Sequence, residues 1–376
     1  MELYIMKKLL YLFLTLIIAA PAYGMASRFG FTARKMVAAA TVSVGTGIGA
    51  KLLTDNRPKI EQKQHMPIAS IWLDTSKYKS NAQYKKQLFI QDCKQYATEN
   101  NKIPVRKEDP SLVRIATYNI HAWKNPYGKK NLDTILDVIN TIDADVIILQ
   151  EAVLDPALMN YISTRLNCSL TNKNFCKTIS YKNNTEFGNI IISKLPIHAL
   201  TSHTYAVPQG KETRCFIKAE LVLANQKKLS IYGTHLEVHD KSWNESKRVS
   251  EIKELLTYTS TDTNENIIIA GDLNAVRKED YQYKIFGKAM WPLLVRENRL
   301  RGYPTPTKAL DTLKANGFID SFTKTDSSNP RFTVWTGTAV DFIFLSPQWN
   351  LPLAGSYIYY NGASDHLPVI LDIKPI

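Results

Sequence analysis

The stretch NIIIAGDLN, residues 266–274, decides the fold class of this chain of 376 residues. Its apolar, β-branched start is typical of a buried strand, and the polar residues Asp272 and Asn274 follow at once. The same pattern recurs in VRIATYNI (113–120), DVIILQE (145–151), GNIIIS (188–193), RCFIKAELVL (214–223), KLSIYGTHLEV (228–238), AVDFIFLS (339–346) and HLPVILDI (366–373). The chain therefore contains many short buried strands that end in polar residues.

Two segments between these strands show helical periodicity. In 132–142 the apolar residues recur at the spacing of one helix face, and in 246–258 a second apolar stripe appears. Many strands with few helices between them argue against a doubly wound parallel sheet. We expect an α/β fold in which two sheets pack face to face, with the helices outside.

The positive charge of the chain is concentrated in its first part. The net charge is +13 and 44% of the residues are hydrophobic, which suits a large folded core. Residues 1–110 carry 17 Lys and Arg against 8 Asp and Glu, whereas the other 266 residues have a surplus of only 4 positive charges. The folded part is therefore not a strongly basic clamp for nucleic acid.

The N-terminal part has the features of an export signal. Residues 6–24 combine a short basic end, an apolar run and small residues, so we expect a signal peptide over 1–24 and an exported protein, secreted or periplasmic. A second apolar stretch, 36–53, leaves a membrane anchor open, although glycines and a lysine weaken that interpretation. We expect a basic linker or extension over 25–110 and a catalytic domain over 111–376.

Four cysteines show no CxxC spacing, which disfavours a structural zinc site. In an exported protein Cys168 and Cys176 could close a small disulfide loop, and the sequence leaves that pairing open. A long insertion over 275–310 lacks strand periodicity and is expected to form a loop or short helices near the site. Its aromatic residues could enter a lipid surface, stack on bases or pack into the core: Tyr281, Tyr283, Phe286 and Trp291.

Polar side chains recur at the ends of the expected strands. Because strand ends at one edge of a sheet lie close together, these groups should form one polar site. They are Asn119, Glu151, His235, Asp272, Asn274, Asp341, Asp365 and His366.

The ordered segments TYNIH, LQE, GNIIISKLPI, THLE, AGDLN, VDFIF and SDHLPV resemble the signature series of the endonuclease/exonuclease/phosphatase family. The resemblance covers about residues 111–376. It implies a four-layer sandwich, two packed mixed β-sheets flanked by helices, and cleavage of phosphate esters with Mg²⁺, or with Mn²⁺ or Ca²⁺ in its place.

The resemblance also implies roles for these side chains. Glu151, with Asn119 and Asp365 nearby, is expected to hold the metal, since Mg²⁺ prefers oxygen ligands. Asp272 and Asn274 are expected to hold the attacking water or the phosphate. The Asp341 carboxylate is expected to fix one ring nitrogen of His366, whose other nitrogen then serves proton transfer or the phosphate.

Three further positions bear on the substrate. His235 resembles the deoxyribonuclease, sphingomyelinase and phosphatase branches, in which it is catalytic. Arg214 matches a phosphate-contacting arginine of nuclease members, with a structural salt bridge as the alternative. Asn189 occupies a substrate-side position of the lipid and inositol phosphatases. The sequence shows no glutamate to orient His235, which counts against the nuclease arrangement.

The other histidines give less specific signals. His235, Glu237 and His239 share one face of a strand, so a zinc site is geometrically open, but the family resemblance uses His235 otherwise. His121 and His203 are expected to be surface or structural residues.

The sequence thus predicts an exported Mg²⁺-dependent phosphoesterase that hydrolyses phosphodiester bonds, favouring a nuclease acting on DNA or RNA. The alternatives are a sphingomyelinase-like enzyme, an inositol-phosphate or phosphoinositide phosphatase and, more remotely, a catalytically silent binding adaptor. Its partner is a phosphate-ester substrate, nucleic acid or phospholipid and inositol phosphate. Membrane contact and the oligomeric state stay open.

Overall fold

The computed structural model describes residues 82–100, 109, 111–180, 185–206, 213–238, 244–281, 284–285, 288–300, 302, 304–325 and 331–375. The chain divides into two units, Met1–His65 and Met66–Ile376, and all described residues belong to the second. The expected signal peptide and the apolar stretch 36–53 lie outside the described residues. Within the described residues, no helix has the length and apolar character needed to cross a bilayer.

The first sheet has six strands in the order β13-β14-β1-β2-β4-β3. β1 and β2 run parallel, whereas the other neighbours are antiparallel, so the sheet is mixed. Its strands are β1 (Val113–Asn119), β2 (Val146–Leu154), β3 (Phe175–Ser180), β4 (Glu186–Ser193), β13 (Leu353–Ile358) and β14 (Val369–Ile373).

The second sheet repeats this plan in the order β11-β12-β8-β7-β6-β5, with β7 and β8 as its parallel pair. Its strands are β5 (Ile197–Thr204), β6 (Cys215–Val222), β7 (Lys228–His235), β8 (Asn266–Asp272), β11 (Ile319–Asp320) and β12 (Asp341–Leu345). A separate two-stranded ribbon consists of β9 (Lys284–Ile285) and β10 (Lys288–Ala289).

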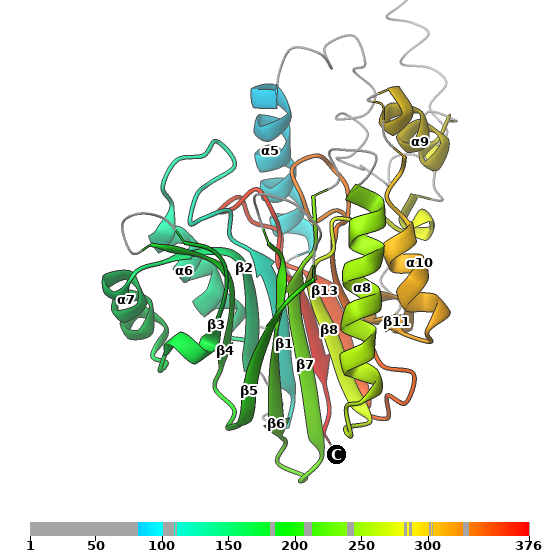
Figure 1. Ribbon diagram of the computed structural model, residues 1–376. Coiled ribbons are helices and arrows are strands. Elements are labelled where there is room, and N and C mark those ends of the chain that lie inside the picture. Colours follow the sequence, from blue (N-terminus) through cyan, green and yellow to red (C-terminus); the bar gives the residue numbers. More distant parts are fainter. Residues whose placement is uncertain are drawn as a thin grey trace, which may run out of the picture. The chain divides into compact units, whose positions relative to one another are not determined.

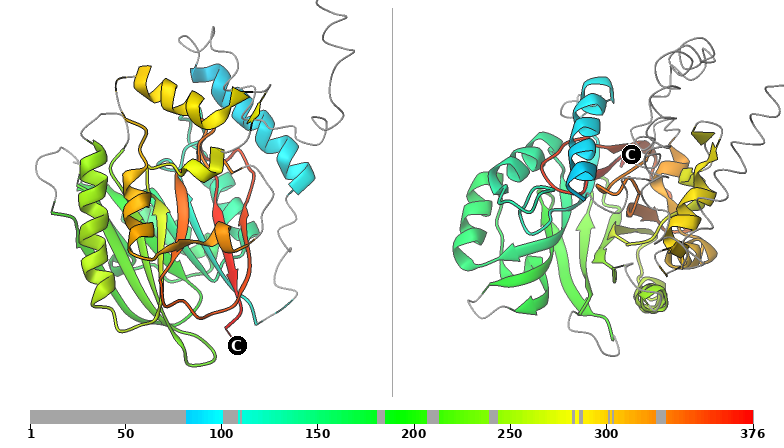
Figure 2. Two further views of the ribbon diagram at one scale, coloured as in Figure 1. Left: turned by 90° about the vertical axis from the view of Figure 1, so that its right-hand side faces the viewer. Right: turned by 90° about the horizontal axis from the view of Figure 1, so that it is seen from above.

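Three apolar clusters build the layers (Figures 1 and 2). One fills the space between the sheets, with Ile115 and Ile148 from the first sheet against Ile231 and Ile268 from the second. The second joins the outer face of the first sheet to α6 (Leu132–Ile142) and α7 (Pro156–Leu166). The third joins the second sheet to α8 (Asn244–Ser260) and α10 (Lys308–Ala315).

The expected fold class is therefore confirmed as two mixed six-stranded sheets flanked by helices. Both faces of the central strands are covered, one by the other sheet and one by helices, and β1 is buried along its whole length. That double burial explains why these strands appear in the sequence as nearly continuous apolar runs rather than as alternating ones.

The strand register gathers the polar residues at one edge. His235, the last residue of β7, pairs with Asp272 at the end of β8, and Asp272 pairs with Asp341 at the start of β12. In the first sheet Asn119 ends β1 opposite Gln150 of β2. Because parallel strands end at the same edge, and β12 begins where β8 ends, these residues lie in one row.

A close approach of two strands requires glycine beside this row. Gly271 has a φ of 151°, and a Cβ there would lie 1.8 Å from the carbonyl oxygen of Thr234. No other residue type fits at that position without moving β7. The Gly271-Asp272 step is therefore a packing requirement of the site.

The insertion forms short elements, as expected: the 3₁₀ helix η4 (Lys278–Tyr281), the β9 and β10 ribbon, and α9 (Met290–Leu300). Tyr281 is fully buried and its hydroxyl accepts a hydrogen bond from the backbone N–H of Ala339, and Trp291 packs near it. These two aromatic residues serve the core. Tyr283 and Phe286 lie outside the described residues.

A helix lies within the segment that the sequence assigned to a linker or extension. α5 (Ala82–Asn100) packs Phe89, Cys93 and Tyr96 against the domain, and Phe89 and Tyr96 both contact Phe332 edge to face. Their spacing is that of one helix face. The remaining small elements are the 3₁₀ helix η3 (Asn172–Asn174) and α11 (Ser321–Lys324).

The disulfide left open between Cys168 and Cys176 is not formed, and all four cysteines are free. The reason is geometric: Cys168 packs with the helix-covered outer cluster, whereas Cys176 belongs to the cluster between the sheets. The two side chains therefore lie on opposite faces of the first sheet. A bond between them would require the side chain of Cys176 to move to the other face of its strand.

Candidate active site

Glu151 leaves the regular geometry of β2. The register of β2 against β4 shifts between Leu149 and Ala152, and Glu151 has a φ of 55° in the left-handed region. A non-glycine residue in this conformation is strained and persists only where the surroundings hold it. Asn119 is one such support, because its Nδ2 donates to Glu151 Oε1 over 3.1 Å.

Asn119 also joins the two sheets. The same Nδ2 donates to Asp272 Oδ2 over 3.0 Å, while its Oδ1 accepts from the backbone N–H of His121. Asn274 adds a contact from the second sheet, since its backbone N–H donates to Asp272 Oδ1 over 2.9 Å. Asp272 is therefore fixed through both carboxylate oxygens.

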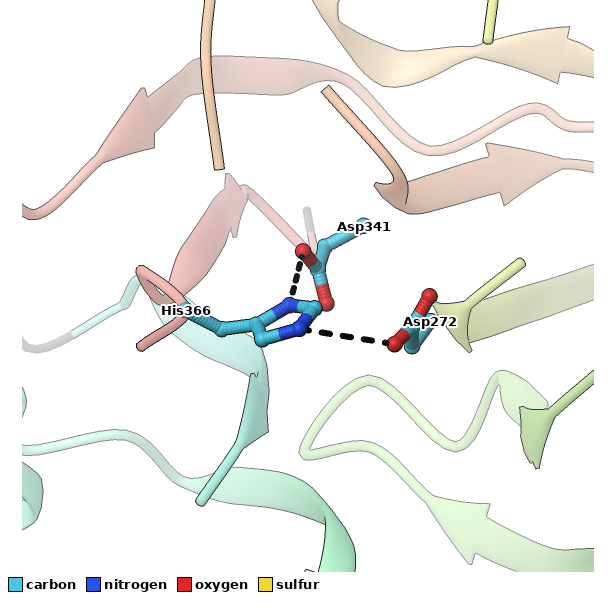
Figure 3. Close-up of side chains that lie close together, drawn as sticks. All are labelled: Asp272, Asp341 and His366. Carbon is cyan, nitrogen blue, oxygen red and sulfur yellow. Dashed lines mark hydrogen bonds and ion pairs between the residues drawn. The ribbon is translucent and has the colours of Figure 1, made fainter. Parts of the chain in front are cut away.

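The imidazole of His366 lies between two carboxylates (Figure 3). Nδ1 is 2.9 Å from Asp341 Oδ2, and Nε2 is 3.8 Å from Asp272 Oδ2. Burial opposes a charged ring, but the charges of Asp341 and Asp272 outweigh it and hold the pKa of His366 well above its usual value. His366 is therefore a cation at neutral pH, with Asp341 fixing its orientation.

Burial, reinforced by the charge of Asp341, raises the pKa of Asp272 to about 7. The nearby imidazolium of His366 and the hydrogen bond from Asn119 act in the opposite direction. Such a carboxylate is a stronger base than an ordinary one and still titrates near neutral pH.

His235 has the opposite protonation preference to His366. Its Nε2 is 3.1 Å from Asn274 Nδ2, and its Nδ1 is 3.3 Å from Arg214 Nη1. Burial lowers the pKa of His235 well below its usual value, and the charges of Arg214 and His366 lower it further. N–H groups face both ring nitrogens, which disfavours a protonated ring, although Asp272 Oδ2 also lies 3.5 Å from Nε2.

Arg214 is buried beside His235. Its side chain is 3% exposed, and besides His235 it has Glu237 at 3.8 Å from Nη2. His235 and Asp272 are buried to a similar extent, so the phosphate contact expected of Arg214 stays a prediction, with the salt bridge as its alternative. The guanidinium lies beside a carboxylate and an imidazole, where it orients the ring.

Asn189 is likewise placed inside the sandwich. It is 1% exposed, and its Nδ2 donates to the carbonyl oxygen of Cys215 over 3.1 Å. This contact ties β4 to β6 between the sheets, and the substrate contact expected of Asn189 stays a prediction. The register of β2 against β4 places Asn189 opposite the irregular step at Gln150 and Glu151, close to the polar edge.

Asp365 lies at the rim with a neighbour that the sequence did not assign to the site. His121 Nδ1 is 3.6 Å from Asp365 Oδ1, and the side chains are 28% and 13% exposed. His121 begins three consecutive residues with positive φ, through Ala122 to Trp123. Only its position two residues after Asn119 could have indicated it.

Polar residues behind the site support Asp341. The backbone N–H of Asp341 donates to Thr333 Oγ1 over 3.1 Å, and Arg331 Nη2 is 3.4 Å from its carbonyl oxygen. Arg331 itself is paired with Asp320, and Arg277 binds the same carboxylate. These buried pairs fix the start of β12, and the sequence did not reveal them because their members are far apart along the chain.

The remaining zinc interpretation finds no support among the described residues. His239 lies outside them, and Glu237 is paired with Lys247 at 3.2 Å. His203 is 2.6 Å from Glu254 and packs against Tyr258, in agreement with a structural role.

Two groups of donor atoms could hold a hard divalent cation, the buried triad and the carboxylates at the rim. Asp272, Asp341 and His366 place one ligand atom each within 4.8 Å of one another. The ring of His366, however, already lies against both carboxylates, and a metal would have to displace its proton. Glu151 and Asp365 are partly exposed carboxylates, which suit an ion that keeps several waters.

A four-layer sandwich that carries acids and imidazoles at one edge is an architecture of phosphoester hydrolases. Residues 116–366 match the model of the endonuclease/exonuclease/phosphatase family, and the chain belongs to that family. The family comprises hydrolases of phosphoester bonds, so the expectation drawn from the ordered segments is confirmed at that level.

Solved structures agree on the fold. An endonuclease/exonuclease/phosphatase from Beutenbergia cavernae DSM 12333 is 16% identical, with a TM-score of 0.53, over 70% of this chain and 71% of that one. A family protein from Leptotrichia buccalis C-1013-b is 17% identical, with a TM-score of 0.50, over 69% and 99%. No curated protein sequence matches the chain.

Proposed function

We propose that the chain is an exported, divalent-metal-dependent phosphodiesterase that acts on nucleic acid. One observation supports the catalytic part of this proposal: two buried histidines in one site have opposite surroundings. His366 lies between the carboxylates of Asp341 and Asp272, which raise its pKa, whereas burial and Arg214 lower the pKa of His235. Titratable groups whose environments drive their pKa values apart mark a site built for acid and base chemistry.

Glu151 and Asp365 would hold the metal, with Asn119 keeping Glu151 in place through the bond from its Nδ2. A bound Mg²⁺ would polarise a phosphoryl oxygen and offset the negative charge that develops as the ester bond breaks. The oxygen-only donor set favours Mg²⁺, Mn²⁺ or Ca²⁺ over softer ions.

Asp272 is suited to act on the attacking water. Asn119 and Asn274 hold both of its oxygens in place, and its raised pKa of about 7 makes it an effective proton acceptor near neutral pH. A water activated by Asp272 would attack the phosphorus as its proton passes to the carboxylate. The phosphorus–oxygen bond to the leaving group would break at the same time, and the leaving oxygen would take a proton from the His366 ring or from water.

His366 is suited to stabilise the phosphate. Its ring is cationic, Asp341 holds Nδ1, and Nε2 faces the same space as Asp272. A fixed cation in a buried site stabilises charge that develops in the transition state more strongly than it would in water. His235, held neutral by its surroundings, contributes a hydrogen-bonding ring nitrogen without a second positive charge.

A basic hairpin beside the site favours nucleic acid as the substrate. Residues 121–131 begin two positions after Asn119 and carry exposed or half-exposed lysines at 124, 129 and 130 around Tyr127, which is 40% exposed. Within the described part of the chain, none of these lysines forms an ion pair. Cations and an exposed aromatic ring suit a phosphate backbone and its bases.

The hairpin is held rigidly in place. Trp123 Nε1 donates to the carbonyl oxygen of Val153 over 2.7 Å, and Asn131 Nδ2 donates to that of Ala363 over 2.8 Å. Lys124 and Lys130 face each other across an antiparallel bridge. A preorganised basic surface binds a polyanion at a lower entropic cost than a flexible loop would.

A second candidate is a sphingomyelinase-like enzyme, and α9 favours it. Val295 and Leu300 on this helix are 38% and 70% exposed, which is unusual for large apolar side chains and would suit contact with a lipid surface. The hairpin therefore favours a nucleic-acid substrate and α9 favours a lipid substrate. One assay distinguishes the two candidates.

The test uses the purified full chain with Mg²⁺ and four substrates: plasmid DNA, RNA, sphingomyelin vesicles and inositol phosphates. The proposal expects hydrolysis of a nucleic acid, abolished by EDTA and weakened steeply by added salt because phosphate contacts release counterions. Hydrolysis of sphingomyelin alone would establish the second candidate. Metal binding without hydrolysis of any substrate would establish a binding adaptor.

The export part of the proposal rests on residues 6–24, whose basic, apolar and small-residue order is that of a signal peptide. N-terminal sequencing of the mature protein recovered outside the cytoplasm tests it. A mature protein that retains Met1 in the cytoplasm would refute export and leave the catalytic proposal intact.

A further inference from the structure

Two cysteines from different sheets meet inside the sandwich. Cys176 lies on β3 of the first sheet and Cys215 begins β6 of the second, and both belong to the apolar cluster between the sheets. The Cys215 thiol donates a hydrogen bond to the carbonyl oxygen of Cys176, with Sγ 3.3 Å from that oxygen. They are 3% and 0% exposed.

Asn189 contacts both Cys176 and Cys215. It is the cross-strand partner of Cys176 on β4, and its Nδ2 donates to the carbonyl oxygen of Cys215 and approaches Cys215 Sγ at 3.6 Å. The spacing of the two strands at this point is therefore set by a contact independent of the thiols. The sulfur atoms are kept near one another by the surrounding structure.

We propose that Cys176 and Cys215 form a disulfide that joins the two sheets when the chain folds in an oxidising compartment. The other cysteines do not compete for either partner: Cys168 packs in the outer cluster, and Cys93 lies on α5. The inference is separate from the proposed phosphodiesterase activity and depends only on the redox compartment.

The bond forms by exchange with an oxidant that carries a disulfide, such as oxidised glutathione. The thiolate of Cys176 attacks one sulfur of the oxidant and expels a thiolate, giving a mixed disulfide. Cys215 then loses its proton and attacks the Cys176 sulfur, expelling the second thiol. The two cysteines lose two hydrogens in total, and the oxidant's disulfide is reduced to two thiols.

In the folded domain, burial raises the pKa of Cys215 well above its usual value, so its thiol is a poor nucleophile there. Because both sulfurs are buried in the folded domain, exchange takes place while the chain folds, before the sheets close over them.

The bond would act on the candidate active site through one neighbour. Cys215 follows Arg214, whose guanidinium contacts His235. A covalent link at Cys215 fixes the start of β6 against β3 and so holds Arg214 beside the ring. We expect the oxidised protein to resist unfolding more strongly than the reduced protein, with the bond constraining the unfolded chain.

The test is refolding of the full chain in a buffer of oxidised and reduced glutathione, followed by blocking of free thiols and trypsin digestion without reduction. Cleavage after Lys173, Lys177, Arg214 and Lys218 separates Cys168, Cys176 and Cys215 into different peptides. We expect a linked pair of the peptides NFCK and CFIK that separates on reduction, and two blocked thiols out of four.

A linked peptide that contains Cys168 or Cys93, or four free thiols in the oxidised protein, would overturn the proposal. Matched variants add a second readout. Cys168→Ser should keep the rise in the urea midpoint that oxidation produces, whereas Cys176→Ser and Cys215→Ser should each abolish it. Their reduced forms serve as the reference, so a general loss of stability in a variant does not affect the comparison.

Discussion

Asn119 and Asp272 belong to different sheets, and the side-chain amide of Asn119 donates to the Asp272 carboxylate over 3.0 Å. The site is thus assembled from both halves of the sandwich. Each sheet contributes through its own parallel strand pair, β1 with β2 and β7 with β8. The distance between catalytic groups is therefore set by how the two sheets pack.

Replacement of Asn119 by alanine should lower kcat/KM by roughly 10²-fold, because Asp272 and Glu151 both lose a donor that orients them. The measurement is steady-state hydrolysis of a small phosphodiester. Asn140→Ala on the exposed face of α6 is the control and should leave the rate unchanged. A fully active Asn119→Ala enzyme would contradict the arrangement described here.

Replacement of Asp341 by asparagine should shift the pH profile of the enzyme. Asp341 is the largest influence raising the pKa of His366, so its loss lets the ring lose its proton at a lower pH. We expect the alkaline limb of kcat/KM to move to lower pH and the maximal rate to fall by about 10²-fold or more. Asp133→Asn, on the exposed part of α6, should change neither.

Glu151→Gln should weaken metal binding. Removing one carboxylate from a site with few protein ligands is expected to raise the Mg²⁺ concentration for half-maximal activity by about 10-fold or more. A thermal-shift titration gives an independent readout, since a cation bound only to the folded state raises Tm. Glu186→Gln on β4 is the exposed control, and equal Tm shifts in both variants would exclude Glu151 as a ligand.

Asp92 on α5 should make the stability of the domain depend on pH. Burial raises its pKa from 3.8 in a model peptide to about 7, and its Oδ2 has no hydrogen-bond partner among the described residues. The folded chain therefore holds a proton that the unfolded chain releases between these values. The free energy of unfolding should fall as pH rises from about 4 to about 7.

Asp92→Asn removes that titration. Relative to wild type, its free energy of unfolding should rise by about 2 kcal/mol between pH 4 and pH 8, which allows for the partial burial of the carboxyl group. Urea unfolding at several pH values measures the difference. A constant difference across this range would show that Asp92 is not protonated in the folded protein.

The same local pattern, an apolar run followed by a polar residue, predicted both the strands of the sheets and the polar edge at which most of the candidate site residues lie. A continuous apolar run, such as the one before Asp272, indicates a strand whose two faces are both covered. The polar residue that follows the run marks the edge of the sheet at which the strand ends. Local order along the chain was enough to place Asn119, His235, Asp341 and His366 at that edge, since strand ends converge whatever the exact register.

Other relations are not contained in the local sequence. Arg214 and Asn189 lie in predicted strands, but whether a side chain of either strand points between the sheets depends on the packing of the other sheet. Cys168 is near Cys176 along the chain, whereas the spatial neighbour of Cys176 comes from another sheet. Among its described residues, the helix at 82–100 has a stripe of only three buried apolar side chains, too few to stand out in a polar, Lys-rich segment.

The place of β14 in the first sheet has a consequence for biosynthesis. β14, Val369–Ile373, lies between β13 and β1, and the loop before it supplies Asp365 and His366. A ribosome that has not yet translated residue 365 carries a chain without these two side chains and with one edge of β1 unpaired. The proposed hydrolysis therefore requires translation past residue 366, and products terminated before it should be inert and prone to aggregation.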